Sequence, residues 1–277
     1  MDIALSTYLF VNHRLNTVWL EKIWQAGFPQ AEIFCARQHL DYRNKSQVRE
    51  LGHWFRDSEM KLHSLHGPIY NDDCWGRTGP QALLTLTEPV KSKRIAIVDE
   101  IKRALEVAEE IPFRYFIQHL GNTQEQFGDE KLDAAFTALE ELSIFAKQRG
   151  VQILLENTPN DLASAKRLNY FLEITHLNLG YCFDTGHAHM NEGIAAAFEL
   201  MRPRIHSTHI HDNEGSEDQH LFPLLQSKGT IDWKQTMPLL AGSEAKWPIV
   251  LELKDTEEFP TPLAAAKESL ARLEELV

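Results

Sequence analysis

Short apolar segments alternate with longer amphipathic segments along the whole chain, and this alternation constrains the fold more than any other feature. Eight segments have the length and composition of β-strands: residues 3–10, 31–35, 62–66, 113–119, 151–156, 179–183, 205–211 and 249–253. Helical periodicity follows each of them, at residues 17–26, 46–58, 90–110, 131–149, 162–174, 193–201, 231–240 and 262–277. Such alternation predicts parallel strands joined by right-handed crossovers.

Eight strand–helix units in a chain of 277 residues most simply close into a (β/α)₈ TIM barrel, so we expect residues 1–277 to form one domain. An open, doubly wound sheet is the alternative. No GxGxxG motif follows the first predicted strand, which removes the commonest cofactor signature of that alternative. The hydrophobic fraction of 43% is sufficient for a substantial core.

Charge and cysteine content indicate the setting in which the protein acts. The net charge of −12 argues against a nucleic-acid partner held by bulk charge. Cys35, Cys74 and Cys182 are scattered without a CxxC pair, which predicts a reducing, cytoplasmic location. The first residues lack the pattern of a signal peptide, and no apolar run approaches the roughly 20 residues of a membrane span. We therefore expect no membrane association, while an oligomer stays open.

The third to eighth predicted strands all end in side chains that can bind a metal. These residues, together with those that follow in the loops, are His66, His119, Glu156, Asp184, His187, His209, Asp218, His220 and Glu252. In a barrel the strand ends face one mouth, so the side chains should converge. Each could be a separately satisfied polar residue, but their clustering favours a functional site. Converging carboxylates need a cation, and mixed carboxylate and imidazole ligands suit Zn²⁺, Mn²⁺ or Fe²⁺ better than Ca²⁺.

The motifs at these strand ends resemble those of the xylose isomerase-like TIM-barrel superfamily. They read HSLHGP, IQHLGN, LLENTP, CFDTGHA, HIHDNEGSEDQH and LELK, and span about two thirds of the chain. The superfamily includes sugar and sugar phosphate isomerases and epimerases, and also the endonuclease IV family of apurinic/apyrimidinic endonucleases. The resemblance implies a shared divalent metal (Mn²⁺, Zn²⁺ or Co²⁺) bound by Glu156, Asp184, His209 and Glu252.

The resemblance also implies that the site can hold up to three ions. In endonuclease IV two further zinc ions are bound. Their ligands match His66 and His119, with Glu156 as a bridge, and His187, Asp218 and His220.

The favoured function is a sugar or sugar phosphate isomerase or epimerase that acts through a metal-stabilised enediolate. Glu156 and Glu252 would remove and return the proton next to the carbonyl, and His187 would hydrogen-bond a substrate oxygen. The predicted contacts to distal hydroxyls or a phosphate are His119, Arg77 and Lys254, and Tyr70 and Trp75 would shield the site. A dehydratase that uses the same enolate chemistry stays open.

The alternative is an endonuclease acting on abasic DNA with up to three zinc ions. The corresponding loop of endonuclease IV is basic, of the form GSRxDRH, whereas residues 214–220 are acidic here and resemble an isomerase-type loop. The basic residues available to hold DNA are Arg37, Arg43, Lys45, Arg77, Lys91, Lys93 and Arg94. A barrel with a purely structural metal is a third interpretation, but structural zinc sites are usually rich in cysteine.

The other histidines of interest have simpler expected roles. His63, an alternate residue of the third strand, should lie in the core or the barrel interior. His189 and His211 should lie close to the metal site or face the substrate without binding the metal.

Overall fold

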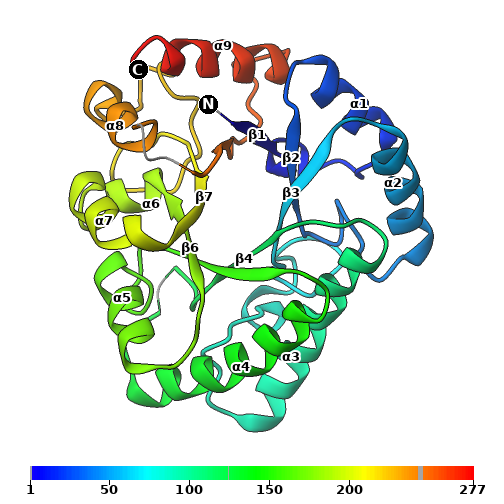
Figure 1. Ribbon diagram of the computed structural model, residues 1–277, viewed down its shortest axis with the longest axis vertical. Coiled ribbons are helices and arrows are strands. Elements are labelled where there is room, and N and C mark those ends of the chain that lie inside the picture. Colours follow the sequence, from blue (N-terminus) through cyan, green and yellow to red (C-terminus); the bar gives the residue numbers. More distant parts are fainter. Residues whose placement is uncertain (1, 124, 243–245) are drawn as a thin grey trace.

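In the computed structural model, eight parallel strands surround a central axis and helices cover their outer face (Figure 1). The structure describes residues 2–123, 125–242 and 246–277. The strands are β1 (Ile3–Ser6), β2 (Gln30–Phe34), β3 (Lys61–His66), β4 (Tyr115–His119), β5 (Gln152–Glu156), β6 (Gly180–Asp184), β7 (Ile205–His209) and β8 (Ile249–Leu251).

The strands follow one another around the barrel in sequence order, and β8 pairs with β1 in parallel. Between β7 and β8, Ile210 forms a parallel bridge with Leu251, and its amide donates to the carbonyl of Val250 at 2.8 Å. These contacts bring the last strand back to the first. The predicted (β/α)₈ barrel is therefore confirmed, and the open sheet is not formed.

Helices connect the successive strands around the outside of the barrel. They are α1 (Thr17–Gln25), α2 (Lys45–Asp57), α3 (Lys91–Leu105), α4 (Asp129–Lys147), α5 (Ala165–Ile174), α6 (Thr185–Met190), α7 (Ile194–Met201), α8 (Trp233–Leu240) and α9 (Pro262–Glu274). Four short 3-10 helices accompany them: η1 (Thr7–Phe10), η2 (Gly79–Ala82), η3 (Glu106–Glu109) and η4 (Arg202–Arg204). Within the described ranges, none of the helices is both long and apolar enough to cross a membrane.

Three local predictions need correction. The first strand ends at Ser6 instead of residue 10, because Thr7–Phe10 turns into η1. The second helix begins at Lys45 instead of residue 46, because the Asn44 side chain caps it by accepting from the amides of Ser46 and Gln47. The sequence also predicts no helix between the sixth strand and residue 193, where the structure has α6.

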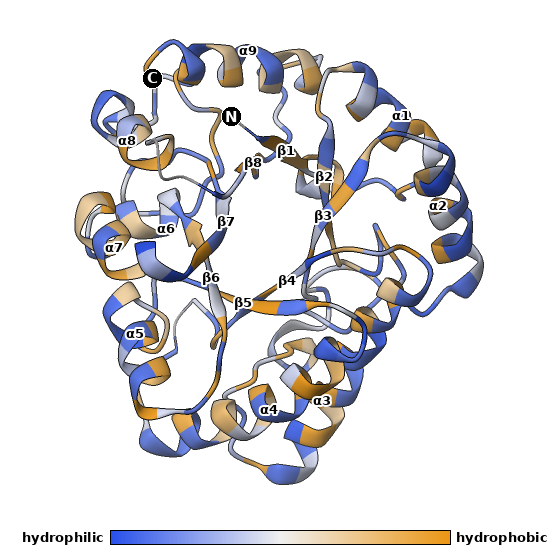
Figure 2. Cartoon of the chain, in the orientation of Figure 1, coloured by the Kyte–Doolittle hydropathy of each residue, from blue (hydrophilic) through white to orange (hydrophobic). Residues whose placement is uncertain are grey.

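The main core lies between the strands and the surrounding helices, which show apolar and hydrophilic patches side by side in Figure 2. A smaller apolar cluster of Tyr115, Ile117, Leu154 and Cys182 is separate from it. These residues precede His119, Glu156 and Asp184 by two or four positions in their strands, so their side chains point to the same side of the sheet, the barrel interior. They form an apolar floor under the polar strand ends.

Candidate metal centre

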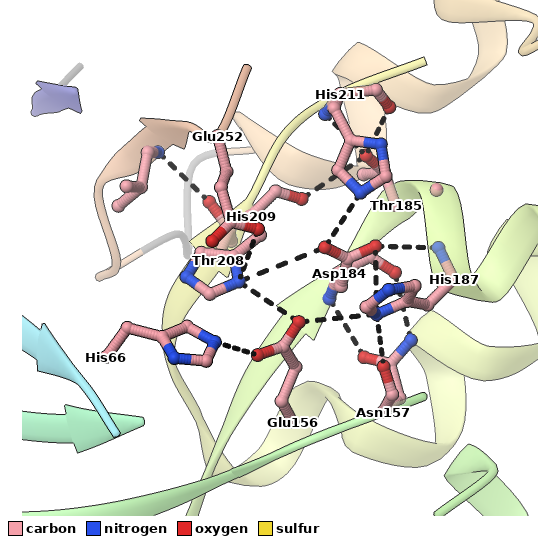
Figure 3. A network of polar contacts seen from close by, with 12 residues as sticks. His66, Glu156, Asn157, Asp184, Thr185, His187, Thr208, His209, His211 and Glu252 are labelled. Carbon is pink, nitrogen blue, oxygen red and sulfur yellow. Dashed lines mark hydrogen bonds and ion pairs between the residues drawn. The ribbon is translucent and has the colours of Figure 1, made fainter. Parts of the chain in front are cut away.

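Four of the predicted ligands meet at the C-terminal mouth of the barrel. Glu156, Asp184 and His209 are the last residues of β5, β6 and β7, and Glu252 directly follows β8. The Nδ1 atom of His209 lies 3.1 Å from a Glu156 oxygen, 3.4 Å from Glu252 and 3.9 Å from Asp184. All four side chains are buried and face one another in Figure 3.

The unpaired atoms of this quartet fit a divalent cation. His209 Nδ1 and Glu156 Oε1 are buried and lie 3.1 Å apart, but neither makes a hydrogen bond within the described part of the chain. Leaving such atoms unsatisfied is costly, whereas a cation would satisfy them together. Ligand atoms from all four residues lie within 4.8 Å of one another. Three carboxylates and one imidazole form a suitable donor set for Mn²⁺, Zn²⁺ or Co²⁺.

The opposite edge of the His209 ring contacts Glu32, a residue that the sequence analysis did not single out. His209 Nε2 lies 3.1 Å from the Glu32 carboxylate, which also accepts a hydrogen bond from Ser64 Oγ at 2.7 Å. With Nε2 donating to Glu32, the Nδ1 lone pair is directed toward the quartet. Glu32 lies in the middle of the buried strand β2, two residues before its end. A charged residue at such a position was the sequence signal that could have identified it as a site residue.

A second group of possible ligands shares Glu156 with the quartet. His119 Nε2 lies 3.1 Å from Glu156 Oε2, and His66 Nε2 lies 3.5 Å from the same atom. The other ring nitrogen of His66 donates to the carbonyl of Gly67 at 2.8 Å, which leaves Nε2 facing the site. The structure therefore brings both predicted histidines to Glu156.

A third group is centred on Asp218. His187 Nε2 and His220 Nε2 each lie 3.2 Å from Asp218 Oδ2. Their Nδ1 atoms donate to the backbone carbonyls of Asn157 and Glu252, both at 2.9 Å, so both rings are fixed with Nε2 toward the carboxylate. All nine predicted ligand positions thus lie at one mouth of the barrel.

The short helix α6 explains the position of His187. Asp184 is its N-cap, and the carboxylate accepts a hydrogen bond from the amide of His187 at 2.6 Å. One residue therefore caps the helix and offers its other oxygen to the quartet. The helix turns the chain so that a histidine three residues after the strand faces the mouth again.

His211 lies beside the predicted ligands, as expected. Its Nε2 is 3.1 Å from Asp184 Oδ2, and its ring stacks on His220 with the centroids 4.0 Å apart. A Cβ atom at Gly186 would come within 2.0 Å of the His211 ring, so only glycine fits there. His63 is buried and contacts Ser207, and His189 contacts Thr230, away from the quartet.

The electrostatics of the site are those of a crowded group of buried acids and imidazoles. Burial raises the pKa of the Glu252 carboxyl to about 7, although His209 and His220 act in the opposite direction. Burial also opposes ionisation of Glu156, but His209 and His119 beside it lower its pKa well below the usual range. The imidazoles thus favour the ionised form of Glu156, while burial favours the protonated form of Glu252.

A cavity of about 220 Å³ opens over these ligands. Its lining includes aromatic and aliphatic residues, among them Tyr8, Phe34 and Trp75, and polar residues such as Gln118 and Thr158. Of the predicted distal contacts, His119 lines the cavity, whereas Arg77 and Lys254 do not. Tyr70 and Trp75 both line it, as expected for shielding residues.

Several of the basic residues considered for DNA contact are engaged with neighbouring oxygens. Arg37 pairs with Asp73 at 2.6 Å and Lys45 with Glu106 at 3.2 Å. Arg43 pairs with the buried Glu100, and the Arg94 guanidinium donates to the carbonyl of Glu88. These contacts engage Arg37 and Arg43 after β2, Lys45 at the start of α2 and Arg94 in α3.

Comparison with known proteins places these features in a family. Residues 20–276 match the family described as xylose isomerase-like TIM barrel. The structure is similar to a D-tagatose 3-epimerase-like protein, with 25% identity, a TM-score of 0.79 and coverage of 100% of this chain and 98% of the other. It shares its fold with the zinc-bound IolI protein, at 18% identity, a TM-score of 0.79 and coverage of 100% and 98%.

One relative comes from the other branch considered above. A protein of Haloquadratum walsbyi named probable endonuclease 4 is 26% identical over 176 residues. The match covers 61% of this chain and 51% of that protein.

Proposed function

The chain belongs to the family of xylose isomerase-like TIM barrels, and on that premise we propose that it is a divalent-metal-dependent sugar isomerase or epimerase. The convergence of Glu156, Asp184, His209 and Glu252 under a small cavity is the observation that supports this most directly. The D-tagatose 3-epimerase-like neighbour supports a sugar substrate, and the zinc atom in the IolI structure supports a divalent metal.

In this proposal the quartet holds the cation, which when bound supplies Lewis acidity that stabilises the negative charge of an enediolate. Glu156 ends β5 and Glu252 directly follows β8, and because these strands are not neighbours in the barrel, the two carboxylates approach the cavity from different directions. One carboxylate oxygen accepts the proton from the carbon next to the carbonyl as the C–H bond breaks.

The second glutamate completes the reaction by donating a proton to carbon. Donation to the same carbon from the other face inverts its configuration, while donation to the former carbonyl carbon moves the carbonyl. His187 lines the cavity with Nε2 beside Asp218, a position from which it can donate a hydrogen bond to a substrate oxygen. The aromatic side of the cavity excludes water from the reacting carbon.

Proton exchange tests this proposal. The Mn²⁺-, Co²⁺- or Zn²⁺-loaded protein is incubated with a panel of ketoses in D₂O, and NMR follows loss of the proton next to the carbonyl. We expect exchange to fall by at least about 100-fold in Glu156→Gln and Glu252→Gln, but not in Glu274→Gln, an exposed control on α9. Absence of exchange with every ketose by folded, metal-loaded protein would refute the proposal.

The endonuclease alternative is supported by the second and third ligand groups and by the relative named probable endonuclease 4. Two observations favour the isomerase over the endonuclease: Arg37 and Arg43 are already paired with carboxylates, and the cavity is small. Elemental analysis and a nicking assay on abasic-site DNA separate the two. About three zinc ions per chain and nicking that is lost in His220→Ala would favour the endonuclease.

We also propose that the protein acts in the reducing cytoplasm on a small-molecule partner. The three cysteines are free, and Cys35 and Cys182 are buried. Retention of activity and thermal stability under strongly reducing conditions is the expected result.

A further inference from the structure

The cavity above the metal ligands has one continuous apolar side. Tyr8, Phe34 and Trp75 contact one another, with ring centroids 4.9 Å apart for Tyr8 and Phe34 and 5.2 Å for Phe34 and Trp75. Ile69 packs against this group, and Leu83 and Leu84 extend the surface. A substrate held here must present carbon and hydrogen atoms to this side.

The lining of the cavity also includes uncharged residues that can form hydrogen bonds, namely Gln118, Asn122, Thr123 and Thr158. Thr123 is exposed, whereas Gln118 is 3% exposed and its amide nitrogen donates to the carbonyl of His119. Such residues can hydrogen-bond the hydroxyl groups of a sugar without adding charge to the cavity.

The fixed charges around the cavity are unfavourable for a phosphate. No lysine or arginine is among the described residues that line it, and Asp218 adds a carboxylate outside the quartet that would hold the cation. The lining histidines are already engaged: His119 with Glu156, and His187 and His220 with Asp218. The nearby cation Arg37 is held by Asp73 and by the carbonyl of Asn71. A phosphate dianion would therefore be desolvated without a cation to pair with it.

We propose that the substrate is an unphosphorylated ketose of about hexose size whose distal end is uncharged and partly apolar, as in a 6-deoxyketose. This inference rests on the proposed function and decides between the sugar and sugar phosphate classes. The carbonyl end lies at the quartet, the hydroxyl groups face the polar lining residues, and the distal carbons lie against the Tyr8, Phe34 and Trp75 rings. A volume of about 220 Å³ is below that of sites for drug-sized ligands and matches a small molecule.

Matched substrates test the inference. Ketohexoses are supplied in free, 6-deoxy and 6-phosphate forms, and the metal-loaded protein is assayed for exchange of the proton next to the carbonyl. We expect kcat/KM for the phosphate to be at least about 100-fold below that for the free sugar, because the phosphate is desolvated without a cation to pair with it. The 6-deoxy form should match or exceed the free sugar. A phosphate that reacts as well as the free sugar would overturn the inference while leaving the proposed function intact.

Binding of the same three forms, measured by calorimetry, gives a readout that does not require turnover. Preferential binding of the free and 6-deoxy forms without exchange would support the substrate class and refute the proposed reaction. Equal or tighter binding of the phosphate would refute the substrate class, whatever the result of the exchange assay.

A gain-of-charge variant gives a further test. Thr123→Lys places a cation at the exposed rim of the cavity, and we expect it to raise kcat/KM for the 6-phosphate by about 10-fold relative to the free sugar. Thr137→Lys, at an exposed position of α4, is the matched control and should leave that ratio unchanged. An equal effect of both variants would show that the charge of the cavity does not determine substrate choice.

Discussion

The two nitrogens of the His209 ring face different partners: Nε2 faces Glu32 and Nδ1 faces the quartet. Glu32 determines which of the two nitrogens carries the proton. The carboxylate lies 3.1 Å from Nε2 and is itself held by Ser64 Oγ at 2.7 Å, so the imidazole is fixed in both tautomer and orientation. Burial would raise the pKa of Glu32, but His209 lowers it to about 2, which keeps the carboxylate ionised. A charged acceptor behind a metal-binding histidine increases its basicity.

Glu32→Gln should therefore weaken binding of Mn²⁺ or Zn²⁺ by about 10- to 100-fold, because the amide keeps the shape of the side chain but loses the charge. Competition with a chromogenic chelator measures the affinity directly, and Glu50→Gln, at an exposed position of α2, is the control. A Glu32→Gln protein that binds metal as tightly as the parent chain would show that Glu32 serves only the packing of β2.

His39 illustrates a buried histidine with a structural role. Its Nδ1 donates to the carbonyl of His13 at 2.6 Å, and its Nε2 accepts from Thr7 Oγ1 at 3.0 Å, an arrangement that needs the neutral ring. Thr7 Oγ1 in turn accepts from the amide of Phe34. Burial lowers the pKa of His39 to about 4, from an ordinary value of 6.5.

The unfolded chain therefore binds the proton more readily than the folded one between pH 6.5 and 4, and stability falls as the pH is lowered through this range. The loss reaches about 3 kcal/mol for this residue. Urea unfolding at pH 7.5 and 4.5, with chelator present, measures it. His39→Gln should be less stable at pH 7.5 but should lose less on acidification, and an identical loss in both proteins would exclude this role of His39.

The loop between β7 and α8 depends on one buried carboxylate. Asp212 Oδ1 accepts from the amides of Asn213, Thr230 and Ile231 at 2.8 to 3.1 Å, and Oδ2 accepts from Trp233 Nε1 at 2.6 Å. Asp212 thus ties together the two ends of the loop that contains Asp218 and His220. A Cβ atom at Gly229 would lie 2.4 Å from this carboxylate, which explains the glycine.

Asp212→Ala should lower the free energy of unfolding by about 3 to 5 kcal/mol, because several buried donors lose their acceptor at once. Chemical denaturation measures the loss, and metal content at saturating zinc reports whether the Asp218 group still forms. Glu217→Ala, an exposed change in the same loop, should have little effect on either quantity. Equal stability of the two variants would contradict the anchoring role.

At the scale of elements, strand ends could be predicted more reliably than what lies between them. The period-two pattern of buried strands, and the ligand side chain at each end, located His66, His119 and Glu156 from the sequence. Glu32 was not predicted as a site residue because it lies two residues before the end of β2, and only the residues at strand ends were considered. The helix α6 is too short for helical periodicity to show in the sequence.

The apolar side of the cavity could not be predicted because its parts are distant in sequence. Tyr8 belongs to η1, Phe34 ends β2, and Trp75 lies in the long connection after β3. They meet only once the barrel closes and brings β1 beside β2 and β3. Neither a motif nor periodicity within one segment records such a contact, so Tyr8 and Phe34 gave no signal as site residues.

For the whole molecule, the proposed metal centre also affects stability. Glu32, Glu156, Asp184 and Glu252 are each at most 2% exposed and surround a single imidazole, His209. Without a cation, the barrel closes around four buried carboxylates and around buried atoms that make no hydrogen bond in the described part of the chain. A cation that binds only the folded chain removes this penalty, so metal content and folding are linked.

Removal of the metal should therefore lower the melting temperature, and readdition should restore it. Free Mn²⁺ or Zn²⁺ at 100 times its dissociation constant stabilises the folded state by about 2.7 kcal/mol, which corresponds to an increase of roughly 5 to 10 °C for a chain of this size. Differential scanning calorimetry after dialysis against a chelator, and again after titration with each metal, measures the effect.

The His209→Ala variant separates this linkage from general ion effects. It removes the imidazole on which the three carboxylates converge, so its melting temperature should no longer respond to metal within the same concentration range. Glu274→Gln should respond like the parent chain, since it lies on the exposed side of α9. If the parent chain melts at the same temperature with chelator and with saturating metal, the strand ends hold no cation. The quartet would then be stabilised by protonation instead. Glu252 would be the first carboxyl to take a proton, because its pKa is raised to about 7.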